Sequence, residues 1–138
     1  MATYNKFNSF VEALAEKVHN LGSDTLKVTF TAAANAPVAT NTVLANLTQI
    51  TLTYVDTQTL VVASSSQTSG TYKLVINDLV ITATGGAVGP LRYVVIYNDT
   101  ASNDELIGWY DYGSEITLAA GETLTLDFNA TNGLLQLA

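Results

Sequence analysis

Cysteine is absent from this chain of 138 residues, and histidine occurs only once, at His19. Without cysteine, the chain forms no disulfide bond and offers neither a thiolate zinc site nor a cysteine nucleophile. A catalytic or metal-binding histidine needs a second histidine or a base and nucleophile arranged around it. We therefore expect no metal and no cofactor, and we expect His19 to have a structural role on the surface, at the end of a helix.

Charged residues are scarce. They make up 12% of the chain, about half of the usual share. The net charge is −7, and all five Lys and Arg residues precede residue 93. Binding to phosphates or to an anionic membrane requires Lys or Arg, so we expect neither nucleic acid nor a membrane as a partner. A neutral surface of hydroxyl and amide groups costs little to desolvate, which suits a protein in permanent contact with neighbours.

Long hydrophobic runs are also missing, and no stretch approaches the ~18 apolar residues of a transmembrane helix. The first six residues contain no basic region followed by an apolar run, so the sequence predicts no signal peptide. The expected site of synthesis and folding is a cytoplasm.

A helix is predicted within residues 1–22. Its apolar stripe has the spacing of one helical face and consists of Phe7, Phe10, Val11, Leu14 and Val18. Gly22 stands where a helix would stop. The stripe is expected to pack in the core or to dock on a neighbouring subunit.

Beyond Gly22 the hydrophobic period changes from 3.6 to 2. Strand patterns occur at 25–31, 50–55, 60–63, 72–76, 79–84, 91–97, 106–112, 116–118, 123–128 and 134–137. A polar turn is expected at 64–70 and a Gly-rich turn at 85–90. Many short strands at this spacing predict a mainly β fold, an antiparallel β-sandwich or jelly-roll-like barrel over residues 23–138, in one compact domain.

The sequence offers only weak candidates for catalytic or ligand-binding motifs. The carboxylates of loop 98–105 lack the spacing of an EF-hand calcium loop. Asp111 and Glu115 flank a single turn and are poorly placed to lie on both sides of a sugar. The glycines of segment 85–89 are followed by neither Lys-Ser/Thr nor a helix, so they predict a plain turn. We expect no enzyme.

Aromatic residues gather in the predicted strands of the second half, at Tyr93, Tyr97, Trp109, Tyr110 and Tyr112. Tyr93 and Tyr97 share one side of a strand, as do Tyr110 and Tyr112. Such a row is consistent with core packing, with a protein interface or with a platform for sugar rings.

Several segments at both ends of the chain have a familiar sequence: Tyr4–Phe7, Phe10–Glu12, Lys17–Val28, Ala36-Pro37, Ala45–Leu47, Tyr93–Asp99, Leu106–Gly113 and Gly121–Phe128. In these segments the sequence resembles a family of small structural proteins of tailed bacteriophages. The segments cover roughly half of the chain, contain no catalytic motif and leave residues 53–72 without a counterpart.

The resemblance implies a virion protein, namely a decoration or cement protein on the capsid surface, made in the host cytoplasm. Its expected partners are the major capsid protein and further copies of itself, in a dimer or trimer. The candidate interface residues are Phe7, Phe10, Leu14, Tyr110 and Tyr112. A tail or baseplate component and a sugar-binding surface module are the alternatives.

Overall fold

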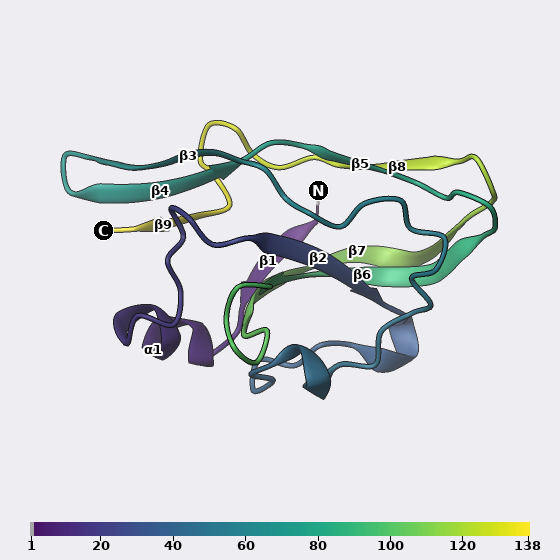
Figure 1. Cartoon of the computed structure of the whole chain (residues 1–138), viewed down its shortest axis with the longest axis horizontal. Coiled ribbons are helices and arrows are strands. Elements are labelled where there is room, and N and C mark those ends of the chain that lie inside the picture. The colour runs from purple at the N-terminus through teal and green to yellow at the C-terminus, as the bar shows by residue number, and fades with distance from the viewer. Residues whose placement is uncertain (1) are drawn as a thin grey trace.

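The computed structural model describes residues 2–138 as two layers of antiparallel β-strands with one short α-helix beside them (Figure 1). The predicted mainly β, sandwich-like fold is confirmed. The lower layer in Figure 1 is one four-stranded sheet, and the upper layer consists of a three-stranded and a two-stranded sheet.

The lower sheet has the strand order β1-β7-β6-β2. Its strands are β1 (Thr3–Lys6), β2 (Leu26–Thr31), β6 (Val88–Asn98) and β7 (Leu106–Leu118). The apolar and β-branched run of β6 pairs with β7 on one side and β2 on the other, so β6 is a central strand of this sheet. Strand β1 covers only residues 108–111 of β7.

The upper layer combines the sheet β3-β4-β9 with the pair β5-β8. Its strands are β3 (Val62–Thr68), β4 (Thr71–Ile76), β5 (Leu79–Thr82), β8 (Thr123–Leu126) and β9 (Leu135–Leu137). Figure 1 shows the β3–β4 hairpin extending beyond the lower sheet, at the end of the molecule where the helix lies.

The main core lies between the two layers. It contains the inward side chains of both, among them Phe30, Leu74, Ile81, Val94 and Ile107. A second apolar cluster covers the opposite face of the lower sheet. It consists of Phe7, Val95, Tyr97 and Leu106, packed against Leu44, Leu47 and Trp109. The segment that carries Leu44 includes two short 3-10 helices, Ala33–Asn35 and Leu44–Asn46.

The N-terminal helix is shorter than predicted. Helix α1 spans Ser9–Ala15, and Thr3–Lys6 is strand β1 of the lower sheet. The prediction of a helix over 1–22 is therefore wrong at both ends. Phe10 and Leu14 do lie on the buried side of the helix, as their spacing predicted. Phe7, however, precedes the helix, and Val18 is exposed.

Further strand and turn predictions also differ from the structure. Residues 50–55 form no regular strand, whereas the serine-rich residues expected to turn belong to β3, which pairs with β4. Gly113 does not end its strand, because β7 continues to Leu118 and includes the segment expected as a separate edge strand. The last two strands, β8 and β9, do not pair with each other, because β9 pairs with β4 and β8 with β5.

Candidate binding groove

An apolar groove of about 830 Å³ opens between the two layers, on the side where β7 and β8 lie. Its walls include Leu91 and Val94 of β6, Tyr110 and Tyr112 of β7, Leu124 of β8 and Phe128. These residues come from both layers, so the groove is a place where the main core reaches the surface. Clefts with mostly apolar walls and a few polar groups are the usual form of binding sites in proteins.

The main-chain edge of β8 borders this groove. Leu124, Thr125 and Leu126 all line it, although successive side chains of a strand point to opposite faces. Consecutive lining residues indicate that the strand presents its edge to the opening. Within residues 2–138, β5 is the only strand that pairs with β8.

The hydrogen bonds of β5 show which groups of β8 point to the free edge. In an antiparallel pair, main-chain groups point alternately toward the partner and away from it. The Thr82 amide points away from β8, because it donates to Asp56 Oδ1 at 2.8 Å. Thr82 lies opposite Thr123, and Val80 lies opposite Thr125. The main-chain N–H and C=O groups of Thr123 and Thr125 are therefore directed outward, away from β5.

Aromatic rings form the inner part of the groove. The Tyr110 ring packs against Tyr4 with 5.4 Å between ring centroids and against Phe128 with 6.1 Å. Burial raises the pKa of the Tyr110 hydroxyl. Tyr112 lies two residues further along the same strand and is 53% exposed. The groove thus has a fixed aromatic interior and one exposed aromatic ring at its border.

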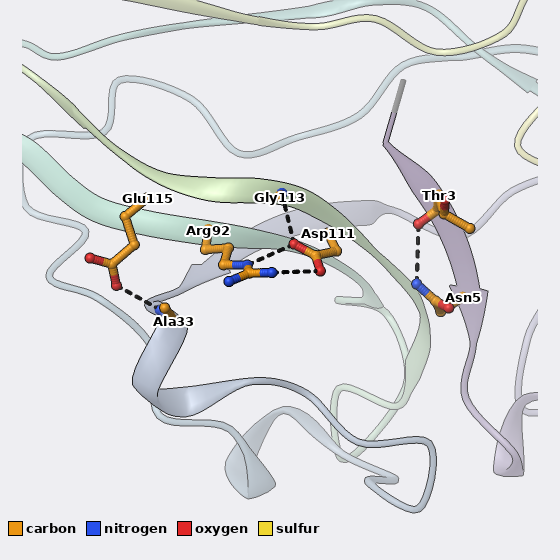
Figure 2. A network of polar contacts seen from close by, with 7 residues as sticks. All are labelled: Thr3, Asn5, Ala33, Arg92, Asp111, Gly113 and Glu115. Atoms are coloured by element: carbon orange, nitrogen blue, oxygen red, sulfur yellow. Dashed lines mark hydrogen bonds and ion pairs between the residues drawn. The ribbon is translucent and has the colours of Figure 1, made fainter.

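A bulge in β7 carries Tyr112. Tyr93 pairs with Asp111 and Leu91 pairs with Ile116, so β7 has more residues than β6 over this stretch. Figure 2 shows the contacts that hold the bulge. The Arg92 guanidinium donates to both carboxylate oxygens of Asp111, at 2.8 and 3.1 Å. Asp111 Oδ1 also accepts the Gly113 amide at 2.8 Å.

The same contacts determine the chemistry of Asp111. Hydrogen bonding from Arg92 lowers the pKa of the Asp111 carboxyl below its ordinary value. Glu115 accepts the main-chain amide of Ala33 at 2.8 Å, which fastens the bulge to the segment beneath the lower sheet (Figure 2). Asp111 and Glu115, the two carboxylates considered as a possible catalytic pair around a sugar, therefore both have structural partners.

The charges of the groove are all negative. Asp78 and Asp127 are its two charged lining residues, and the stretch of chain from residue 93 onward contains no Lys or Arg. Asp78 Oδ1 accepts the Phe128 amide at 2.8 Å, which ties the end of β8 to the start of β5. Asp127 is exposed at the border of the groove. An uncompensated carboxylate beside an apolar surface favours a cationic group on any bound partner.

The five candidate interface residues do not form one surface. Phe7 and Phe10 are fully buried, and Leu14 is half-buried against the main core. These three residues stabilise the monomer and offer little surface to a partner. Tyr110 and Tyr112 both line the groove, so the structure brings together only this pair. Trp109 points to the opposite face, where its ring packs 4.5 Å from Phe7.

The groove also uses residues that sequence reasoning did not single out as a site, namely Leu124, Thr125, Asp127 and Phe128. Their strict alternation predicts a strand with one buried face. Only the tertiary pairing shows that one edge of this strand has no partner strand among residues 2–138.

His19 is buried and not on the surface as predicted. The side-chain oxygen of Asn98 accepts the amides of Thr100 and Ala101, which fixes the orientation of its NH₂ group. This NH₂ group then donates to His19 Nδ1 at 2.9 Å and to Asp24 Oδ2 at 2.7 Å. Nδ1 must accept this bond, so His19 is neutral, and burial lowers its pKa.

Other polar groups considered for chemistry are also tied into the structure. In the acidic loop, Asp99 forms an ion pair with Lys27 at 3.0 Å, and Glu105 accepts hydrogen bonds from Asn103. Within residues 2–138, no three His, Asp or Glu side chains come together as metal ligands do. No helix in this part of the chain has the length and apolar character needed to cross a membrane.

Comparison of the chain with protein-family models, curated proteins and solved structures found no match.

Proposed function

We propose that this protein is a non-enzymatic structural component of a tailed-bacteriophage particle, a decoration protein that binds major capsid subunits on the head. The observation that carries the proposal is the apolar groove with a free strand edge at its border. A protein that works by contact needs an apolar surface at which a partner can be desolvated. The resemblance of both chain ends to phage structural proteins supplies the kind of partner.

The fate of the polar groups supports a role in contact over a role in catalysis. The single histidine is buried in a hydrogen-bond network with Asn98. Asp111 is held by Arg92, and Glu115 is bonded to a main-chain amide. General acid–base catalysis needs such groups to face a substrate. Here they maintain the fold and the shape of the bulge.

The copy number of the protein in purified particles tests the proposal. A capsid decoration protein is expected in many copies, in a fixed ratio to the major capsid subunit. Quantitative mass spectrometry of particles measures this ratio, and binding of purified protein to undecorated heads provides the complementary assay. A few copies per particle would favour the tail or baseplate alternative. Absence from the particle would contradict both.

The oligomeric state is a separate part of the proposal. We propose a dimer or trimer on the capsid, where several copies contacting a lattice gain avidity without tighter individual contacts. Sedimentation of the free protein at several concentrations measures whether the oligomer exists before it binds.

Exposure of the Tyr112 ring favours a second candidate function, binding of sugars at the particle surface. An exposed tyrosine can stack on a sugar ring. Binding of glycans that is lost in Tyr112→Ala and kept in Tyr54→Ala, a variant of another exposed tyrosine, would support it.

A further inference from the structure

We infer that the groove receives an extended segment of a partner protein, which adds as a strand to the outer edge of β8 with apolar side chains inward and a Lys or Arg beside Asp127. The partner's identity as a capsid protein rests on the proposed function. The chemistry of the segment rests on the groove alone.

The first argument is the free edge of β8. Thr123 and Thr125 direct main-chain donors and acceptors away from β5, and no strand within residues 2–138 takes them up. Unpaired edges are the usual sites at which an extended peptide joins a sheet. Because Thr125 itself lines the groove, an added strand would lie in the groove and not on the outer surface.

The second argument is the alternation along β8. Leu126 and Phe128 are buried and Leu124 is half-buried, whereas Thr125 and Asp127 are exposed. Side chains directly opposite each other on paired strands share a face of the sheet. The added segment must therefore present apolar side chains to the inside, over Tyr110, and polar side chains to the outside.

The third argument is charge. Asp127 is on the outer face of the same strand, and Asp78 is the other charged residue of the groove. The protein carries a net charge of −7. A cationic side chain opposite Thr125 or Asp127 would meet a carboxylate, and an anionic one would be repelled. The segment is thus expected to alternate apolar residues with Lys, Arg or Thr.

The opposite side of the sandwich shows what such closure looks like. There the bridging segment, residues 54–60, connects β2 to β5 by main-chain contacts with both layers. Val28 N donates to Gln58 O at 2.9 Å, and Thr84 N donates to Tyr54 O at 2.9 Å. On the β7–β8 side, no segment among residues 2–138 makes such main-chain hydrogen bonds to both layers. The partner segment would make them to β8.

A defined peptide tests the inference in the isolated protein. The probe is a short blocked peptide in which valine alternates with lysine and threonine. Its control replaces each lysine with glutamate. Backbone NMR shifts of the labelled protein are expected at residues 124–128 and Tyr112 with the lysine peptide. The glutamate peptide is expected to bind with an affinity at least about tenfold lower than that of the lysine peptide.

Two charge-reversal variants sharpen this test. Asp127→Lys is expected to invert the preference between the two peptides. Glu16→Lys changes the net charge equally, at an exposed position of the segment that follows α1, and is expected to leave the preference unchanged. Equal binding of both peptides, an unchanged preference in Asp127→Lys, or shifts confined to another surface would overturn the inference.

The requirement for main-chain pairing has its own test. A lysine peptide N-methylated at alternate residues cannot complete the strand hydrogen bonds and is expected to lose binding. Unchanged binding would show that no strand is added. Peptide-independent shifts of the same residues with protein concentration would instead place a second copy in the groove and overturn the inference. None of these results depends on the particle, so failure here and failure of the proposed function are distinguishable.

Discussion

The two long sides of the sandwich are built from the same kinds of strand but end differently. On the β2–β5 side, the bridging segment bonds to both layers: Leu60 N donates to Leu26 O at 2.9 Å, and Asp56 Oδ1 accepts the Thr82 amide. On the β7–β8 side, the layers are joined by no such segment within residues 2–138, and the groove lies between them.

This difference separates a closed side of the sandwich from a side where the core reaches the surface. Main-chain groups of β2 that would otherwise form a free edge are taken up by residues 58–60, so the β2–β5 side contributes to stability. The outward main-chain groups of β8 have no such hydrogen-bonding segment among residues 2–138. Mutations on the two sides should therefore divide into those that change folding and those that change binding.

The largest expected effect compares two leucines. Leu60 on the closed side is 5% exposed, whereas Leu124 lines the groove and is half-buried. Leu60→Ala should lower the free energy of unfolding by about 3 kcal/mol, because the buried methyl groups of the Leu60 side chain are removed and a cavity remains. Leu124→Ala should cost about 1 kcal/mol, since much of its surface already meets solvent. Urea denaturation of both variants measures this, and equal losses would contradict the contrast.

Two aspartates provide a second matched pair. Asp56 accepts the Thr82 amide, whereas Asp127 lies at the border of the groove. Asp56→Ala removes the acceptor of a main-chain amide and should cost about 1 kcal/mol in the free energy of unfolding. Asp127→Ala should leave stability nearly unchanged and weaken partner binding. A larger stability loss in Asp127→Ala than in Asp56→Ala would show that the groove border is structural.

A smaller effect, confined to acidic pH, concerns His19. Its pKa in the folded protein is lowered by burial, while carboxylates of Glu105 and Asp24 oppose this in part. The folded state therefore binds fewer protons than the unfolded state. The stability linked to the neutral ring is complete above the unfolded pKa of about 6.5 and is lost as the pH falls through the folded pKa.

The measurement is chemical denaturation of the wild type and of His19→Gln at pH 8 and pH 5. Other groups titrate in both proteins, so the difference between their losses isolates His19. The wild type should lose more stability on acidification than the variant. A larger loss in His19→Gln would mean that the sign of the pKa shift is wrong.

The smallest effect on stability is expected at the bulge. The Arg92–Asp111 ion pair is partly exposed, and such pairs contribute little to folding. Arg92→Gln should leave the denaturation midpoint close to that of the wild type, yet alter the environment of Tyr112. NMR shifts of Gly113 and Tyr112 report this change. Identical spectra around the bulge would show that the pair does not hold it.

Sequence patterns predicted the parts of the fold whose local and tertiary preferences agree. Strand β6 is β-branched and aromatic, and it is central in the sheet. The strand predicted from the alternating pattern of residues 50–55 is not formed, because Ile50, Leu52 and Val55 pack on the core without joining a β-ladder. The serine-rich β3 was missed since pairing with β4, including a contact between the Ser65 and Tyr72 hydroxyls, outweighs its weak strand preference.

The candidate site was predictable only in part. Tyr110 and Tyr112 share a side of their strand, and both line the groove. Phe7, which lies between strand β1 and helix α1, and Phe10 of α1 are buried, in agreement with the prediction that the helical stripe packs in the core. Gly108 could have indicated that another segment lies against β7, since an isolated glycine in a strand often marks a close approach. In the structure, the Tyr4 ring of β1 makes this approach. The free edge of β8 depends on which strands are absent beside it, and no local pattern encodes that.

Amide hydrogen exchange at β8 tests the central claim most directly. In the free protein, the Thr125 amide should exchange faster than the amides of Leu124 and Leu126, which face β5. When the protein binds its particle or the lysine peptide, exchange at Thr125 should slow, because a strand now covers that edge. Protection of Thr125 already in the free protein, or unchanged exchange on binding, would contradict the claim that β8 is an open docking edge.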